Sequence, residues 1–101
     1  MPGVTRDGDA TTTGHGCDGT TTVTGPSGDV FCNSLGVERL GDPTVSHDIP
    51  VGDPVVCTAH TSSISAGSGT VFTNGKPTAR IGDACDGGAI TGGSGNVFAG
   101  G

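Results

Sequence analysis

The sequence has few of the side chains with which a small protein usually builds its core. Its 101 residues include no Trp, no Tyr and only three Phe, and hydrophobic residues of all kinds make up 31%. A chain of this length buries a limited share of its surface in any case. We therefore expect the fold to need reinforcement from a bound metal ion, from disulfides or from a partner subunit.

Positive charge is also scarce, because four Lys and Arg stand against ten Asp and Glu, for a formal net charge of −6. This charge disfavours nucleic acid and anionic membrane surfaces as partners. The sequence has no apolar stretch long enough to span a bilayer and no signal-peptide pattern at its N-terminus. We therefore expect synthesis in a cytoplasm, where the four cysteines (Cys17, Cys32, Cys57 and Cys85) are expected to be thiols or metal ligands, with a disulfide frame as the alternative.

Glycine, by contrast, is abundant, at 21 residues, and Thr and Val are frequent. Gly weakens helices, whereas Thr and Val favour half-buried strands. No window combines helical apolar spacing with freedom from Gly and Pro. The composition predicts an all-β fold with many tight turns, formed as a single domain over residues 1–101.

One five-residue pattern, Ser-Gly-x-Val-Phe, occurs three times, beginning at Ser27, Ser68 and Ser94. A second pattern, Arg-x-Gly-Asp, follows the first two copies at the same distance, beginning at Arg39 and Arg80. Repetition at fixed spacing indicates repeated structural units.

The third copy of Arg-x-Gly-Asp begins at Arg6 and has no Val-Phe before it, so the chain starts with the second half of a repeat and ends with the first half. We infer three units around a pseudo-threefold axis, with residues 94–101 paired to residues 1–9. Such closure also removes free sheet edges. In each Arg-x-Gly-Asp we expect Gly to adopt a backbone angle that other residues avoid and Asp to cap a turn.

Each repeat is expected to form a short hairpin that starts at Val-Phe. Asn74-Gly75 is a strong signal for the two-residue turn of such a hairpin, and Asn33-Ser34-Leu35-Gly36 is a weaker one. Residues 43–66 contain Pro50 and Pro54 and are expected to be mostly loop.

Residues of metal-binding types follow each Gly-Asp closely. These are His15, His47 and Cys85, and the long loop adds His60. In a threefold body the first three positions converge on the axis. Three imidazoles and one thiolate form a tetrahedral set suited to zinc, with iron as the alternative, and four protein ligands leave no open position, so the predicted site is structural.

Other interpretations of these residues remain open. Each histidine taken alone is typical of a solvent-exposed hydrogen-bonding side chain in a turn. Cys17 or Cys57 could supply the sulfur in place of Cys85, whereas Cys32 lies in a predicted strand and is expected to be a small buried residue.

Pro77-Thr78-Ala79-Arg80, followed by Gly82-Asp83, resembles the proline-alanine-alanine-arginine signature of the PAAR-repeat family, and the Ser-Gly-x-Val-Phe units followed by Asn-Gly resemble its strand-turn unit. The resemblance implies a sharp cone of short β-hairpins with a triangular base and with zinc pinning the apex. Carried over to this sequence, the zinc ligands are His15, His47, His60 and Cys85.

The resemblance also implies a function. Family members cap the trimeric β-helical spike of contractile phage tails and type VI secretion systems, one tip per trimer, and meet the target membrane transiently. Because the sequence ends at Gly101, directly after the last half-repeat, we expect a bare tip without a fused toxin, located on a virion tail or a secreted spike.

An enzyme and a free-standing binding module are two other classes of function. A thiol enzyme built on Cys57 and His60 is disfavoured because the sequence shows no nucleophile elbow, oxyanion loop or carboxylate pair, so we expect no catalytic activity. A free-standing β-type binding or adhesion module is the alternative function.

Overall fold

The computed structural model describes residues 1–101, which form an elongated, helix-free body of 44 × 23 × 22 Å. Ten short strands pair into five antiparallel hairpins: β1 (Ala10–Thr12) with β2 (Thr20–Thr22), β3 (Phe31–Cys32) with β4 (Leu35–Gly36), β5 (His47–Val51) with β6 (Val56–His60), β7 (Phe72–Thr73) with β8 (Lys76–Pro77), and β9 (Ala84–Cys85) with β10 (Gly88–Ala89). The all-β prediction is confirmed. No helix long and apolar enough to cross a membrane is present.

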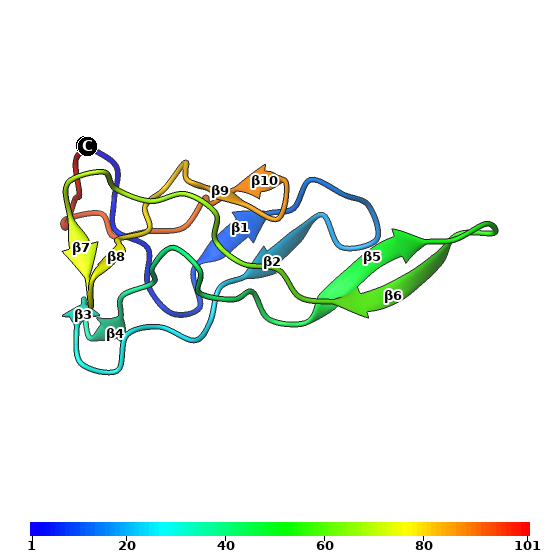
Figure 1. Cartoon of the computed structure of the whole chain (residues 1–101), viewed down its shortest axis with the longest axis horizontal. Helices are drawn as coiled ribbons and strands as arrows, with labels where there is room; N and C mark the ends of the chain where they lie inside the picture. The colour runs from blue at the N-terminus through cyan, green and yellow to red at the C-terminus, as the bar shows by residue number, and fades with distance from the viewer.

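The two ends of the long axis differ (Figure 1). Hairpins β3–β4 and β7–β8 lie at one end, together with the C-terminus, and hairpin β5–β6 projects from the other end. We call these two ends the base and the apex.

A ring of three backbone hydrogen bonds joins three distant segments of the chain around one axis. The N–H of Thr5 donates to the carbonyl of Ala79, the N–H of Ala79 to that of Glu38, and the N–H of Glu38 to that of Thr5, each at 3.0 Å. All three residues are buried. The ring confirms the predicted pseudo-threefold arrangement.

The two ends of the sequence together complete the third unit. The Val4 N–H donates to Val97 O at 2.9 Å and the Ser94 N–H donates to Val4 O at 2.8 Å. In the first unit the Val37 N–H makes the equivalent bond to Val30 O at 3.0 Å. The predicted pairing of residues 94–101 with residues 1–9 is therefore present.

Each Arg-x-Gly-Asp copy forms the same turn. In the copy that begins at Arg39, the backbone N–H of Arg39 donates to Asp42 Oδ2 at 2.8 Å, and the guanidinium donates to both oxygens of that carboxylate, at 2.8 and 3.0 Å. Gly41 between them has a φ of 93°, in the left-handed region that Gly alone enters without cost. Both expected roles of this pattern are confirmed.

The turn signals also hold. Asn74 and Gly75 have φ values of 53° and 78°, and Asn33 and Ser34 have 52° and 67°. Two successive positive angles are those of a type I′ turn, whose twist matches that of paired strands.

The prediction of a loop over residues 43–66 was wrong. β5 and β6 pair over five positions, from His47 opposite His60 to Val51 opposite Val56, and form the longest hairpin of the molecule. Both strands of a two-stranded ribbon are edge strands, where Pro50 is tolerated, so proline did not exclude a strand here.

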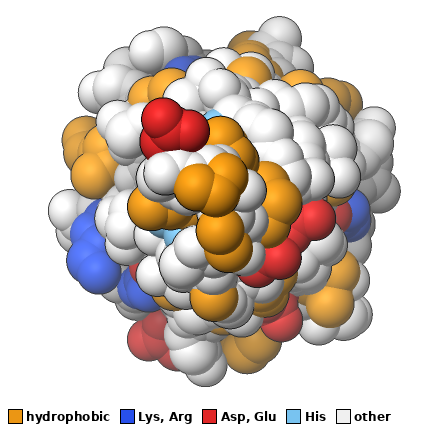
Figure 2. Space-filling view, turned by 90° about the vertical axis from the view of Figure 1, so that its right-hand side faces the viewer, with side chains coloured by type: hydrophobic (Ala, Val, Ile, Leu, Met, Phe, Trp, Pro, Cys, Tyr) orange, Lys and Arg blue, Asp and Glu red, His pale blue; other side chains and the backbone are white.

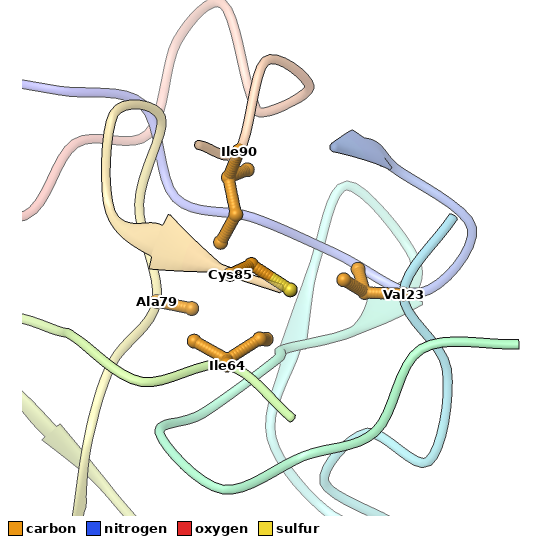
Figure 3. Packing of buried hydrophobic residues seen from close by; sticks show 5 residues of the cluster. All are labelled: Val23, Ile64, Ala79, Cys85 and Ile90. Atoms are coloured by element: carbon orange, nitrogen blue, oxygen red, sulfur yellow. The ribbon is translucent and has the colours of Figure 1, made fainter. Parts of the chain in front are cut away.

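Two small apolar clusters form the core. One contains Val23, Ile64, Ala79, Cys85 and Ile90 (Figure 3). The other contains Val4, Cys32, Val37 and Ala99, so Cys32 is buried as predicted. Clusters this small leave much of the stabilisation to hydrogen bonds and cross-links.

Glu38 brings an ionisable group into this core. Its side chain is 0% exposed, and neither carboxyl oxygen has a hydrogen-bond partner. Burial, reinforced by the negative charges of Asp42 and Asp7, raises the pKa of Glu38 to about 8. The group is therefore neutral in the folded protein at pH 7 and charged in the unfolded chain.

The Glu38→Gln variant should be more stable than the wild type at pH 7, by about 2–3 kcal/mol, because folding no longer requires protonation of a carboxylate. Because the pKa of Glu38 is raised in the folded state, the free energy of unfolding of the wild type falls as the pH rises from about 4.5 to about 8. The variant has no carboxyl group at this position and should not show this fall. Urea unfolding at pH 5 and pH 8 measures the difference; equal pH dependence in both proteins would contradict it.

Gly41→Ala should lower the free energy of unfolding by about 1–2 kcal/mol, because alanine is strained at a φ of 93°. Gly28→Ala is the matched control, since an added Cβ there meets nothing within 4 Å and its φ is not positive. Thermal melting of the two variants compares them. A similar loss in both would argue against the special role of the Arg-x-Gly-Asp glycine.

Candidate metal centre

Four side chains converge near the apex. His15, His47, His60 and Asp86 each offer one ligand atom, and these atoms all lie within 4.8 Å of one another. The Nε2 atoms of His15 and His47 lie 2.8 and 2.6 Å from Asp86 Oδ2, and His60 Nε2 lies 3.0 Å from Asp86 Oδ1. We call these four residues the His₃Asp group.

Three hairpins position the group. His47 opens β5 and His60 closes β6, so the two are direct cross-strand partners. His15 comes from the loop between β1 and β2, residues 13–19. Asp86 occupies the turn between β9 and β10, where Asp86 and Gly87 have φ values of 52° and 76°. The group therefore joins one hairpin from each unit of the pseudo-threefold body.

The hydrogen bonds of the ring nitrogens indicate that a cation belongs between these side chains. His15 Nδ1 lies 2.9 Å from the carbonyl oxygen of Gly16, and His47 Nδ1 lies 2.9 Å from that of Val45. A carbonyl can only accept, so both Nδ1 atoms carry a proton, and in neutral imidazole Nε2 then has a lone pair. Two lone pairs would face an acceptor carboxylate, which is unfavourable unless a proton or metal ion lies between them.

The same backbone carbonyls provide the support that metal-binding histidines usually have. A histidine ligand commonly donates its second ring N–H to a carbonyl or carboxylate, which fixes its tautomer and orientation. The residues present therefore fit a divalent metal ion.

The charge state of Asp86 fits as well. Burial raises the pKa of Asp86, but its close contacts with His60, His15 and His47 outweigh burial and hold the pKa at about 2. The hydrogen bond to the Gly16 carbonyl, with the nearby Asp86, raises the pKa of His15. Asp86 can therefore offer an anionic oxygen to a metal ion at any physiological pH.

The structure brings together three of the four sequence-predicted ligands and leaves out Cys85. The Cys85 side chain is fully buried among Val23, Ile64 and other apolar residues (Figure 3), and burial raises the pKa of its thiol. A metal ligand is a thiolate, so this environment opposes ligation. Asp86, the next residue, occupies the predicted place of Cys85.

The repeat itself contained the signal that distinguishes these two residues. Cys85 lies two residues after Asp83, as Thr11 follows Asp9 and Thr44 follows Asp42. All three of these positions are buried and form equivalent bridges, Thr11 to Ile90, Thr44 to Val23 and Cys85 to Ile64. The register therefore marks Cys85 as a core position, and Asp86-Gly87 is a type I′ turn signal that the sequence analysis missed.

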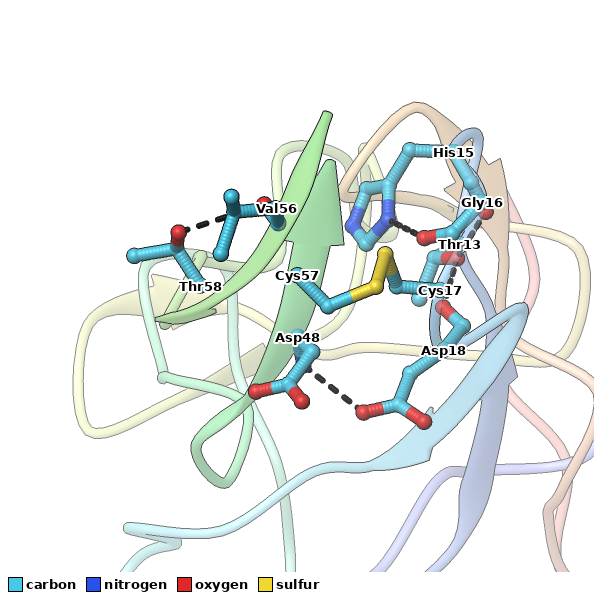
Figure 4. Close-up of a disulfide and its surroundings, with 9 residues drawn as sticks. All are labelled: Thr13, His15, Gly16, Cys17, Asp18, Asp48, Val56, Cys57 and Thr58. Carbon is cyan, nitrogen blue, oxygen red and sulfur yellow. Dashed lines mark hydrogen bonds between the residues drawn. A yellow bond between two sulfur atoms is a disulfide. The ribbon is translucent and has the colours of Figure 1, made fainter. Parts of the chain in front are cut away.

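Cys17 and Cys57 form a disulfide, with their Cα atoms 5.9 Å apart (Figure 4). Neither is therefore a competing ligand, and the expectation that all four cysteines are thiols or metal ligands was wrong for this pair. The expected compartment could not reveal this pairing, which depends on the fold bringing the two residues face to face near the apex. Cys32 and Cys85 are free thiols.

The comparisons with known proteins agree with the repeat architecture. The PAAR motif family profile matches residues 7–90. The chain belongs to the PAAR motif family. Proteins with this motif are associated with the spike tips of contractile injection systems, where they have a structural role. Among curated proteins, none matches this chain.

His60→Ala and Asp86→Ala should each abolish retention of a divalent metal ion and lower the melting temperature sharply, because each removes one ligand of the His₃Asp group. Cys85→Ala is the discriminating control. It should retain one equivalent of metal while losing stability through a small core cavity. Elemental analysis of the purified proteins measures the metal. Retention in Asp86→Ala together with loss in Cys85→Ala would restore the sulfur ligand predicted from the sequence.

Proposed function

We propose that this chain is the rigid, metal-pinned tip that caps the trimeric β-helical spike of a contractile injection machine, either a phage tail or a type VI secretion system. Its role is mechanical: the tip narrows the spike where it meets a target membrane. The observation that carries this proposal is the ring formed by Thr5, Glu38 and Ala79, through which one chain presents threefold symmetry.

Symmetry explains why such a ring suits a cap. A trimer ends in three equivalent surfaces, which a single asymmetric subunit cannot engage equally. Three similar units within one chain offer each spike subunit a matching contact. One tip per trimer follows from this arrangement.

The base offers apolar side chains for that contact. The Phe of each Ser-Gly-x-Val-Phe copy is exposed, with Phe31 at 62%, Phe72 at 57% and Phe98 at 50%. Phe31 and Phe72 lie in β3 and β7, at the end opposite to hairpin β5–β6 (Figure 1). Exposed aromatic residues are typical interface anchors, and the strand ends beside them can extend the strands of a spike.

At the apex, the His₃Asp group would hold zinc, with iron as the alternative. Four protein ligands leave no position for a substrate, which supports a structural rather than a catalytic ion. When bound, the ion supplies binding free energy, on the order of 10 kcal/mol, to an end of the molecule that lacks a core. The residues orient one another: the Gly16 and Val45 carbonyls fix two imidazoles, and the carboxylate of Asp86 faces all three.

The hairpin beyond the metal centre is apolar at its end. Figure 2 looks onto this end and shows hydrophobic side chains gathered there. Val51 and Val56 form the last pair of the hairpin and, like Val55 of its turn, are exposed. This surface supports transient contact with a membrane. We place synthesis in the cytoplasm and the mature protein on a tail baseplate or a secreted spike.

A free-standing binding or adhesion module is the alternative. It requires no affinity for a trimeric spike and no dependence of stability on metal. The three exposed phenylalanines at the base and the His₃Asp group both favour the function of a spike tip.

Co-purification with the spike trimer encoded nearby tests the proposal. The wild type should bind at one chain per trimer, and the Phe31→Asp/Phe72→Asp variant should bind at least tenfold more weakly, since it places charge in an apolar contact. Val55→Asp, which changes an equally exposed residue at the other end, should bind as the wild type does. Equal binding by all three, or none by the wild type, would contradict the assignment.

A further inference from the structure

The loop of residues 13–19 and hairpin β5–β6 are joined at two places. One is the His₃Asp group, which includes His15 from the loop and His47 with His60 from the hairpin. The other is the disulfide from Cys17 of the loop to Cys57 of the hairpin. Cys57 pairs with Pro50, nearer the tip of the hairpin than the His47–His60 pair. The cross-link therefore holds the same two segments together beyond the metal centre.

Little else connects the loop to the hairpin. The Asp48 N–H donates to Asp18 Oδ2 at 2.7 Å, and the Asp18 N–H donates to Asp48 O at 3.2 Å. Asp18 is exposed and Asp48 is half-buried, and Figure 4 shows the bond from Asp48 to the Asp18 carboxylate. A single hydrogen bond contributes only about 0.5–1.5 kcal/mol to stability, so outside the His₃Asp group the disulfide is the strongest link between the loop and the hairpin.

One residue of the loop has an unfavourable backbone conformation, which favours opening of the loop. Cys17 has a φ of 65°, in the left-handed region that costs free energy for residues other than Gly. The cross-link holds Cys17 in this conformation. Reduction would let it relax, and His15 lies only two residues away.

Both sulfur-bearing residues are accessible to small reagents. Cys17 and Cys57 are exposed, whereas the free thiols of Cys32 and Cys85 are buried. Thiol–disulfide exchange requires access of a thiolate to a sulfur atom, and exposed disulfides are the labile ones. Only this pair of cysteines meets that condition.

We propose that Cys17 and Cys57 form a thiol–disulfide exchange site that controls how long the apex retains its metal ion. The proposal rests on the metal centre of the proposed function. The co-reactants are small thiols and disulfides of the glutathione class. In a reducing cytoplasm the loop is open and the ion exchanges; in an oxidising surrounding the disulfide closes the apex over the bound ion.

The exchange balances in two steps. A thiolate of the pair attacks a small-molecule disulfide, whose sulfur–sulfur bond breaks as a mixed disulfide forms and one small thiol leaves. The second cysteine then attacks the mixed disulfide, so that the Cys17–Cys57 bond forms and the second small thiol leaves. The two small thiols take up the two electrons and the two protons that the cysteines lose.

The test compares metal release from the oxidised and reduced full-length protein, each loaded with one equivalent of zinc. Reductant is removed anaerobically before excess chelator is added, and release is followed over time. The reduced protein should lose zinc at least about tenfold faster, because local opening of the loop is easier. The Cys17→Ser/Cys57→Ser variant should release at the fast rate under both conditions, and Cys32→Ser should behave as the wild type.

The outcomes separate this proposal from the one on which it rests. Zinc bound by both forms and released at equal rates would overturn the exchange site and leave the metal centre standing. No zinc bound by either form would overturn both. A thiol count provides a further check. Treatment of the reduced protein with oxidised glutathione should lower the number of reactive thiols, counted after denaturation, from four to two. A count that stays at four overturns the exchange site.

Discussion

Three backbone hydrogen bonds around one axis hold the molecule in its shape. Thr5, Glu38 and Ala79 each give one N–H and one carbonyl to the ring, and each comes from a different part of the chain. With so few large apolar side chains, side-chain packing alone does not fix how three units meet. Backbone hydrogen bonds are directional and available at any residue except proline, so they suit a chain rich in Gly and Thr. The arrangement of the three units around the axis follows from this ring.

The apex follows a different principle, because a projecting hairpin has no core behind it. An isolated two-stranded ribbon is marginal in water. Here the ribbon begins at the His47–His60 pair of the His₃Asp group and is held further along by the disulfide of Cys57. One end of the molecule is thus stabilised by ring closure and the other by cross-links. The shared constraint is the shortage of apolar surface.

Much of the fold and of the candidate site could be predicted from the sequence because the same two sequence patterns recur in all three units. The copies of Ser-Gly-x-Val-Phe and Arg-x-Gly-Asp predicted the pseudo-threefold body. The distances of His15 and His47 from Gly-Asp, together with His60 from the long loop, led to three members of the His₃Asp group. The fourth member required the register of side chains within a unit, which separates buried Cys85 from Asp86 in the adjoining turn. Hairpin β5–β6 is longer than its counterparts in the other two units, and the Cys17–Cys57 bond joins two different units, so the repeat offered no second copy of either feature.

The pairing of Val4 with Val97 bears on how this chain reaches its folded state. Contacts between residues so far apart in sequence lose much chain entropy before they return any energy, and they are associated with slow folding. The ring cannot close around Thr5 until strands from all three units have met. Folding should therefore be a late and collective event, in which the segment around Thr5 waits for partners that lie far from it in the sequence.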